Sequence, residues 1–163
     1  MKRILLLLAA ALGLVLLGRA LVRSFASDET RIRWLVEDMA DGFDRTRMDP
    51  ILAGIADDFR DKTSGCDRQE LRQAIAYLFF TAKDPATKRF PYRVEARLER
   101  LSIDRGGDDP SAECEVDARF LERLGDQESE AWRISLTARL QRGAAGWRIR
   151  SASWVTRAGR RIR

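Results

Sequence analysis

Residues 92–104 read YRVEARLERLSID, and apolar and charged side chains alternate along them as far as Leu98. This period of two is typical of a β-strand that buries one face and exposes the other. The phase then slips, because the next apolar residues, Leu101 and Ile103, stand at odd positions. One extra residue near Glu99–Arg100 would form a β-bulge, which bends and twists a sheet.

Three further segments alternate in the same way, over residues 112–120, 132–140 and 147–155. Glycine-containing turns separate the four segments from one another. Consecutive alternating strands joined by short turns indicate an antiparallel meander.

One register of the two central strands separates apolar from polar side chains. Pairing Phe120 with Trp132 places Ala118 opposite Ile134 on a single apolar face. The other face then carries charged and polar pairs: Arg119 with Arg133, Asp117 with Ser135, and Glu113 with Arg139. A sheet with one apolar face needs a cover, which preceding helices must supply.

Three helices are predicted ahead of the sheet. The first covers residues 27–46 behind a serine cap, the second covers residues 50–59 after an Asp-Pro start, and the third covers residues 68–80. Asp67 and Glu70 have the spacing of a capping box before the third helix. The predicted fold class is therefore α+β: three N-terminal helices packed on a curved four-stranded antiparallel meander, preceded by an N-terminal apolar anchor or signal helix.

Residues 1–27 are predicted to be a signal anchor or a signal peptide. Two basic residues precede an apolar run over residues 4–18, which would make roughly 22 Å of helix. That length suits a signal peptide, whereas extension to residue 22 would approach the roughly 20 residues that span a bilayer. Ser24 and Ala26 supply the small residues that a cleavage site requires. We expect an inner-membrane protein with a periplasmic domain, or a periplasmic or secreted protein if the signal is cleaved.

The chain carries 30 basic and 25 acidic residues, no histidine, and a formal net charge of +5. Residues 1–27 and a basic tail, residues 157–163, each hold four basic residues and no acid. The domain between them, residues 28–156, therefore has 22 basic and 25 acidic residues. This balance argues against nucleic-acid binding, and the absence of histidine excludes Ser-His-Asp catalysis and histidine-based zinc sites.

Three parts of the chain carry a resemblance to a known superfamily. They are the segment over residues 49–59, the helix over residues 68–80, and the Gly-Trp-Arg-Ile opening of the last strand at residues 146–149. Together with the order of the elements, they make residues 28–156 resemble the nuclear transport factor 2-like superfamily, which includes SnoaL-like cyclases and ketosteroid isomerases. The resemblance implies a cone in which helices close a concave sheet around a pocket.

The enzymes of that superfamily place an Asp-His pair, or Asp and Tyr, inside the cone. This chain has no histidine, and the inward positions of its four predicted strands hold no carboxylate, so no catalytic residue is carried over. We expect a non-enzymatic ligand-binding or assembly module that needs no metal or cofactor. The alternative is a small-molecule isomerase, cyclase or hydrolase that uses the cone interior. Because many members dimerise by sheet packing, a homodimer through the sheet is a further expectation.

The candidate contact residues fall into two groups. Tyr77, Trp132 and Trp147 are candidates for lining a pocket for an apolar small molecule, although the same rings could simply fill the core. The candidates for a partner or membrane contact are Trp34, Arg157, Arg160 and Arg161. Membrane contact is also expected through the N-terminal helix.

Two other groups of residues leave alternatives open. Cys66 and Cys114 would meet an oxidising compartment after export, so the sequence permits a disulfide between them without requiring it. Asp57, Asp58 and Asp61 are expected to end the second helix in solvent rather than to hold a metal ion.

Overall fold

The computed structural model describes residues 26–85, 87–106, 109–125, 127–160 and 162. The expected anchor or signal helix lies outside these residues except at its last two positions. Within the described ranges, no helix combines the length and the apolar character needed to cross a bilayer.

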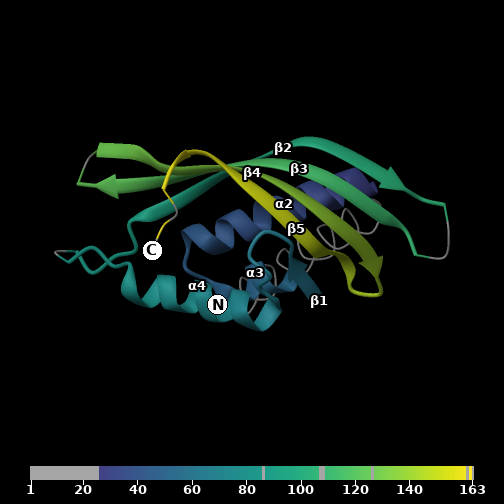
Figure 1. Ribbon diagram of the computed structural model, residues 1–163, viewed down its shortest axis with the longest axis horizontal. Coiled ribbons are helices and arrows are strands. Elements are labelled where there is room, and N and C mark those ends of the chain that lie inside the picture. The colour runs from purple at the N-terminus through teal and green to yellow at the C-terminus, as the bar shows by residue number, and fades with distance from the viewer. Residues whose placement is uncertain (1–25, 86, 107–108, 126, 161, 163) are drawn as a thin grey trace, which may run out of the picture.

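A mixed five-stranded sheet and three helices form the described domain, which is therefore α+β. The strands lie in the order β1-β5-β4-β3-β2, with β1 parallel to β5 and the other neighbours antiparallel. Their bounds are Ile55–Asp61 for β1, Tyr92–Asp104 for β2, Ser111–Leu124 for β3, Gln127–Gly143 for β4 and Gly146–Gly159 for β5. Figure 1 shows the long strands arching over the helices, which cover the concave face.

The predicted register of the central strands is confirmed. Phe120 pairs with Trp132 and Ala118 with Ile134, and Arg119 lies opposite Arg133 on the outer face. The predicted bulge is also present, because the pairing of β2 with β3 shifts between Leu98 and Arg100. The phase slip in the sequence therefore marks the point at which the edge strand bends.

The three helices are α2 (Asp28–Asp44), α3 (Met48–Ala53) and α4 (Arg68–Thr81). Ser27 caps α2 by accepting a hydrogen bond from the Thr30 N–H at 3.2 Å. Asp67 and Glu70 form the predicted capping box of α4, each carboxylate accepting from the other residue's N–H at 2.9 Å. Both caps satisfy backbone donors that a helix start leaves without partners.

The second predicted helix, over residues 50–59, is wrong in its second half. α3 ends at Ala53, and the following residues form strand β1, which pairs in parallel with β5. Ile55 and Phe59, four residues apart, fit a helical stripe, but the same spacing also fits one face of a strand, and both side chains join the same core. The predicted four-stranded meander is thus the antiparallel part of a five-stranded sheet.

The change from α3 to β1 occurs at Gly54, where α2 passes very close. A Cβ atom at this position would lie 2.6 Å from Met39 Sδ and 2.9 Å from Leu35 Cδ1. The Gly54 carbonyl accepts a hydrogen bond from the Ile149 N–H at 2.8 Å, which aligns β1 with β5. The missing side chain therefore lets a helix and the sheet edge approach each other.

The core of the domain consists of two clusters that adjoin at Leu136. The first, which we call the packed end, centres on Ile32 and includes Cys114 and Trp147. The second, centred on Trp132, is smaller and is built largely from partly buried side chains. None of the buried residues in the described part of the chain is polar or charged.

Candidate functional site

Seven aromatic rings form a continuous set of contacts around the second cluster, and we call this region the aromatic end. Each ring has at least one other ring of the set with its centroid 5.1–5.6 Å away, a distance typical of favourable aromatic pairs. The seven residues are Phe43, Phe79, Phe90, Tyr92, Phe120, Trp132 and Trp154.

The rings come from elements that are far apart in the sequence but end at the same place. Phe43 closes α2 and Phe79 closes α4, while Tyr92 opens β2. Phe120 on β3 stacks on Trp132 of the neighbouring strand at 5.1 Å, and this strand pairing is the one that the sequence predicts. The aromatic end is thus a product of tertiary convergence.

The aromatic end is less completely buried than the packed end. Trp132 is only 8% exposed, whereas the other six rings are half-buried. Ile162, beyond the last strand, packs against this cluster. Figure 1 shows the C-terminal end of the chain turning back beneath the sheet toward the helices.

The polar atoms of the aromatic end have partners. Trp132 Nε1 donates to Thr156 Oγ1 at 3.1 Å, and Trp154 Nε1 donates to Asp61 Oδ2 at 3.3 Å. Tyr92 Oη donates to Glu122 Oε1 at 3.0 Å. Burial, reinforced by this carboxylate, raises the pKa of the Tyr92 hydroxyl.

Asp44 is a further carboxylate at the rim of the aromatic end. Its Oδ1 accepts a hydrogen bond from the Val94 N–H at 2.7 Å, which joins α2 to the edge strand β2. Partial burial raises the pKa of the Asp44 carboxyl, and the hydrogen bond from Val94 opposes this effect.

The three predicted pocket residues do not come together. Trp132 lies in the aromatic end, but Trp147 belongs to the packed end, where its Nε1 donates to Asp28 Oδ1 at 3.0 Å. On β4, Trp132 and the residue paired with Trp147 are ten positions apart, roughly 33 Å along the strand. Tyr77 is 67% exposed on α4 and contributes to neither cluster.

The residues predicted for a partner or membrane contact are also dispersed. Trp34 is half-buried on α2, and Arg157 and Arg160 are exposed. Arg157 belongs to β5, which continues to Gly159, so the predicted basic tail begins inside the sheet. Arg161 lies outside the described residues.

The permitted disulfide between Cys66 and Cys114 is absent, and both residues are thiols. Cys66 follows β1, and Cys114 lies on β3, three strands away in the sheet order. At roughly 4.8 Å per strand, this separation exceeds the reach of a disulfide, about 7 Å between Cα atoms. Burial raises the pKa of the Cys114 thiol to about 11.

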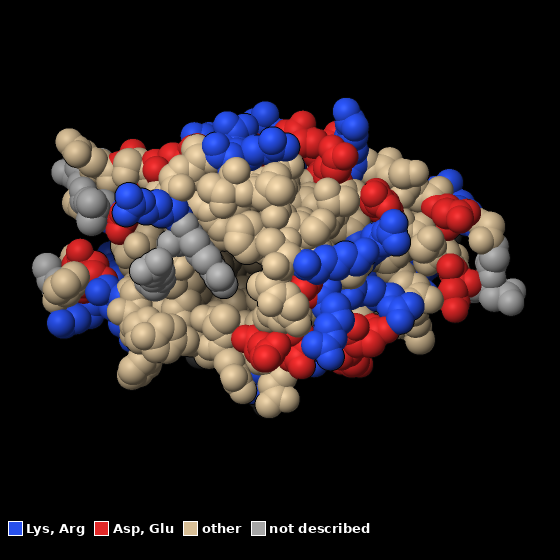
Figure 2. Space-filling model, in the orientation of Figure 1, with Lys and Arg blue, Asp and Glu red and all other residues tan. Residues whose placement is uncertain are grey.

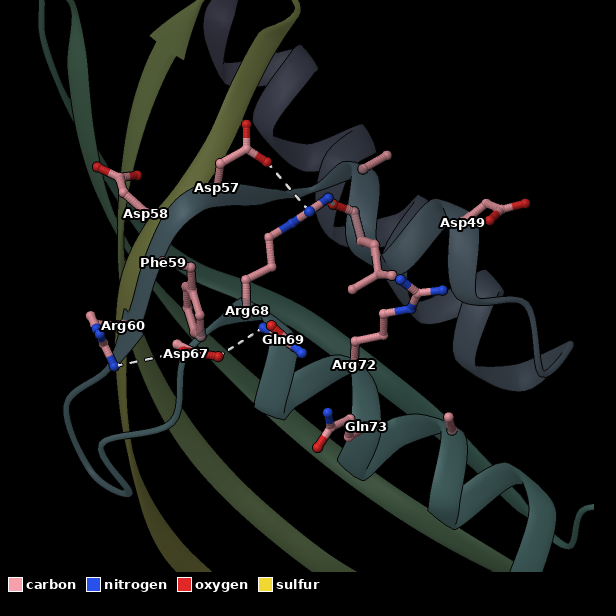
Figure 3. A pocket seen from close by; sticks show the side chains of 13 residues that line it. Asp49, Asp57, Asp58, Phe59, Arg60, Asp67, Arg68, Gln69, Arg72 and Gln73 are labelled. Carbon is pink, nitrogen blue, oxygen red and sulfur yellow. Dashed lines mark hydrogen bonds and ion pairs between the residues drawn. The ribbon is translucent and has the colours of Figure 1, made fainter.

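A polar groove of about 1020 Å³ lies between β1 and α4 (Figure 3). Asp57 on β1 faces Arg68 of α4 across this groove, with Oδ1 and Nη1 3.3 Å apart. Arg68 Nη2 also donates to the Leu52 carbonyl at 3.2 Å. Charged, paired side chains of this kind protect an exposed sheet edge from pairing with another chain. We therefore interpret the groove as a protected edge.

Asp57, Asp58 and Asp61, which the sequence predicts at the end of the second helix, lie on β1 instead. Asp57 and Asp58 form ion pairs, and Asp61 accepts hydrogen bonds in the following turn. Asp58 pairs with Arg150, and Asp61 accepts hydrogen bonds from the N–H groups of Thr63 and Ser64. In the described part of the chain, no group of three acidic or cysteine side chains is arranged to hold a metal ion.

Comparisons with known proteins concern the fold. No family model and no curated protein sequence matches the chain. Among solved structures, a cystatin-like domain of unknown function from Nostoc punctiforme has a TM-score of 0.61 and 18% identity over 80% of this chain and 78% of that one.

Two further solved structures are proteins of unknown function described as NTF2-like. The one from Shewanella baltica has a TM-score of 0.57 and 14% identity over 80% of this chain and 94% of that one. The one from Pseudomonas putida has a TM-score of 0.52 and 18% identity over 77% of this chain and 84% of that one. The chain therefore has the nuclear transport factor 2-like cone fold, which confirms the resemblance seen in its sequence.

Most of the aromatic end was not among the residues singled out in the sequence. Phe43 and Phe79 read as ordinary members of helical stripes, and Trp154 lies in the last strand, where the predicted alternation ends. A usable signal existed: the aromatic residues gather at the ends of predicted elements. Sequence alone could not show that these ends meet.

Proposed function

We propose that this chain is an exported or membrane-anchored envelope protein whose cone-shaped domain binds an apolar small molecule, without catalysis, at the aromatic end. The observation that carries the proposal is the half-buried state of six of the seven rings. Rings left partly exposed at one end of a cone can gain burial by contact with a ligand, which is favourable in water.

The chemistry of the aromatic end favours a neutral, apolar ligand. The indole N–H groups of Trp132 and Trp154 already donate to protein oxygens, so the site offers ring faces and edges. The aliphatic side chain of Ile162 packs against the same cluster. An acyl chain or a small aromatic compound would make contacts of the same kind.

The alternative function, an isomerase, cyclase or hydrolase, would need a titratable group aimed at a substrate. Asp44 and Tyr92 are the titratable groups with raised pKa at the aromatic end. Asp44 is engaged with the backbone of Val94, and Tyr92 with Glu122. These contacts support binding rather than catalysis.

Assembly through the sheet would use a highly charged outer face. Arg119 pairs with both Glu95 and Glu130, and Arg133 forms two hydrogen bonds with Asp117. A homodimer through this face would be a polar, salt-sensitive interface, since charged residues are depleted from the cores of stable interfaces. The outer face therefore supports assembly less well than the aromatic end supports ligand binding.

Photolabelling with an octanol that carries a diazirine group would test the ligand site. The full chain is irradiated with the probe in detergent, and the labelled peptides are mapped by mass spectrometry. We expect adducts around Phe120, Trp132 and Trp154, reduced several-fold by excess unlabelled octanol. Adducts spread evenly over the surface, or confined to residues 1–25, would contradict the proposal.

A pair of variants sharpens this experiment. Trp132→Ala should lower labelling of the aromatic end several-fold, because it removes the ring that stacks on Phe120. Val155→Ala removes an exposed apolar side chain on the same strand as Trp154 and should leave the labelling unchanged. Equal losses in both variants would point to a general effect on folding.

Mass spectrometry of the mature N-terminus would test the predicted location. A protein that retains residues 1–27 in the membrane fraction supports an anchor, and a mature chain that starts at Ser27 supports a cleaved signal. An intact, soluble cytoplasmic chain would contradict both forms of export.

A further inference from the structure

The C-terminal half of α4 exposes large apolar side chains to solvent. Phe80 is 78% exposed and Tyr77 is 67% exposed, and both belong to the same helical surface because they are three residues apart. Among the described residues, Val155, 54% exposed, is the one other large apolar residue that lies mostly in solvent. Two such residues side by side form a patch rather than the scattered exposure that is normal for a protein surface.

α4 is loosely attached to the rest of the domain. None of its 14 residues is fully buried. Its inward side chains, such as Leu71 and Phe79, are only half-buried, while Tyr77 and Phe80 point away from the core. The helix therefore has apolar residues on both sides, and the domain covers only one of them.

Three basic residues follow the exposed rings. Lys83, Lys88 and Arg89 are all exposed, and no ion pair that involves them occurs among the described residues. Lys83 Nζ lies 5.5 Å from the centre of the Phe80 ring. The acidic residue in this segment, Asp84, accepts hydrogen bonds from the N–H and the hydroxyl of Thr87. The segment is thus locally basic within a domain that has a net negative charge.

The loop after α4 holds these basic residues in a defined arrangement. The Asp84 N–H donates to the Arg89 carbonyl at 2.9 Å, and the Lys88 N–H donates to the Asp84 carbonyl at 2.8 Å. Lys88 has a left-handed backbone conformation, with φ of 58°, which closes the turn. Figure 2 shows basic side chains at the end of the molecule where α4 passes into this loop.

Apolar and basic residues share one hollow at this place. A surface cavity of about 730 Å³ is lined by Phe79, Phe80, Phe90 and Met48, by Lys83, Lys88 and Arg89, and by one acidic residue, Asp44. Aromatic side chains beside basic residues suit the interface of an anionic bilayer, where rings enter the headgroup region and cations meet phosphates. A purely acidic protein surface would complement the charges but would leave Tyr77 and Phe80 without an apolar partner.

We propose that the end of α4 and the following loop, residues 77–90, form a docking surface for an anionic phospholipid bilayer. This surface is separate from the apolar N-terminal segment, and it adjoins the proposed ligand site, with which it shares Phe79 and Phe90. Docking would bury the Phe80 and Tyr77 rings among lipid headgroups and place Lys83, Lys88 and Arg89 against phosphates. The domain would then lie on the membrane in one orientation, instead of moving freely on a tether.

A fluorescence-quenching experiment on the full chain tests the docking surface. In a Cys66→Ser background, Ala76→Cys places a fluorophore beside the patch, because Ala76 is exposed and lines the same hollow. Ser111→Cys places it at the exposed start of β3, as the matched control. The buried Cys114 thiol should stay unlabelled at neutral pH, because burial raises its pKa to about 11.

Vesicles contain lipids with doxyl quenchers and either phosphatidylglycerol or only phosphatidylcholine. With phosphatidylglycerol, we expect quenching at position 76 to be at least threefold greater than at position 111. High salt should reduce this difference, since it screens the attraction between the cations and the lipid phosphates. The triple variant Lys83→Glu, Lys88→Glu and Arg89→Glu should abolish the difference in quenching between positions 76 and 111. The variant Phe80→Ser should remove most of this difference.

These four substitutions change exposed residues, so the thermal unfolding midpoint should change little and serves as the folding control. Equal quenching at positions 76 and 111 would overturn the proposal. The same quenching in pure phosphatidylcholine vesicles, or in the triple charge reversal, would also overturn it. Each of these results would leave the exposed rings as a contact for a protein partner.

Discussion

The turn at Gly159 directs the C-terminal residues of the chain back over the aromatic end. The substitution Gly159→Ala tests whether this turn is required for that cover. Gly159 has a φ of +71°, and a Cβ atom there would lie 2.1 Å from the Ala131 carbonyl oxygen. No small adjustment accommodates that distance, since the obstacle is backbone. We therefore expect the chain after residue 158 to leave the sheet.

The size of the effect follows from what the released segment contributes. It loses the hydrogen bond from the Arg160 N–H to the Ala131 carbonyl, 3.1 Å long, and the packing of Ile162 against the aromatic end. The hydrogen bond contributes about 1 kcal/mol, and a half-buried isoleucine contributes about 1 kcal/mol. The free energy of unfolding should therefore fall by roughly 2 kcal/mol, and not by more, because release of the segment relieves the clash.

Gly65→Ala is the matched control. Gly65 has a similar φ of +77°, but an added Cβ would meet nothing within 4 Å. Its cost should be the conformational cost of a left-handed alanine alone, about 1–2 kcal/mol. The native tryptophan fluorescence should change in Gly159→Ala, where Trp132 and Trp154 lose cover, and should stay unchanged in Gly65→Ala.

Denaturant unfolding of four chains completes the test: wild type, Gly159→Ala, a chain that ends at residue 159, and the two changes combined. If Gly159→Ala acts by releasing the chain end, the combined chain is no less stable than the truncated one. Additive losses, or an unchanged tryptophan spectrum in Gly159→Ala, would refute this reasoning.

Three further predictions concern the sheet and two titrating groups. Deletion of Glu99 removes the bulge and keeps Leu98 and Leu101 on the inner face, so the free energy of unfolding should fall by only about 1 kcal/mol. Deletion of Arg97 moves Leu98 to the outer face and should lower the free energy of unfolding by more than about 3 kcal/mol. Denaturant titration measures both losses. Equal losses from the two deletions would show that the bulge does not set the register. Cys114 should resist a thiol reagent at pH 8 in the native protein and react only on unfolding, because burial raises the pKa of its thiol to about 11. A fast reaction in the native protein would contradict the burial of this thiol. Burial also raises the pKa of the Asp44 carboxyl in the folded protein, so the unfolded chain loses this proton at a lower pH than the folded chain does. The protonated carboxyl therefore contributes stability below its ordinary pKa, and this contribution is lost as the pH rises through the pKa of the folded protein. Asp44→Asn should remove this part of the pH dependence between pH 3 and 7 while keeping an acceptor for the Val94 N–H, and an identical pH profile would contradict the assignment.

Local periodicity in the sequence was sufficient to predict the four long strands and the register of the central pair, β3 with β4. Alternation over residues 92–98 and its phase slip identified β2 and its bulge, and the pairing of Phe120 with Trp132 placed β3 against β4. These features could be predicted because a strand repeats every two residues, so a sequence records directly which side chains face the core. The capping box at Asp67 could be predicted for a similar reason, since it depends on residues only three positions apart.

The fifth strand and the aromatic end were decided by tertiary structure. Ile55 and Phe59 fit a helix as well as a strand, and the parallel pairing with β5, almost a hundred residues away, selected the strand. Phe43 and Phe79 read as ordinary members of helical stripes, and Trp154 as part of the last strand. Only the convergence of two helix ends with the sheet joined them and Trp132 in one set of ring contacts. The local pattern of a sequence specifies which face of a helix or strand is apolar. Which helix ends and strand ends come into contact depends on long-range packing, and no local period of the sequence encodes that.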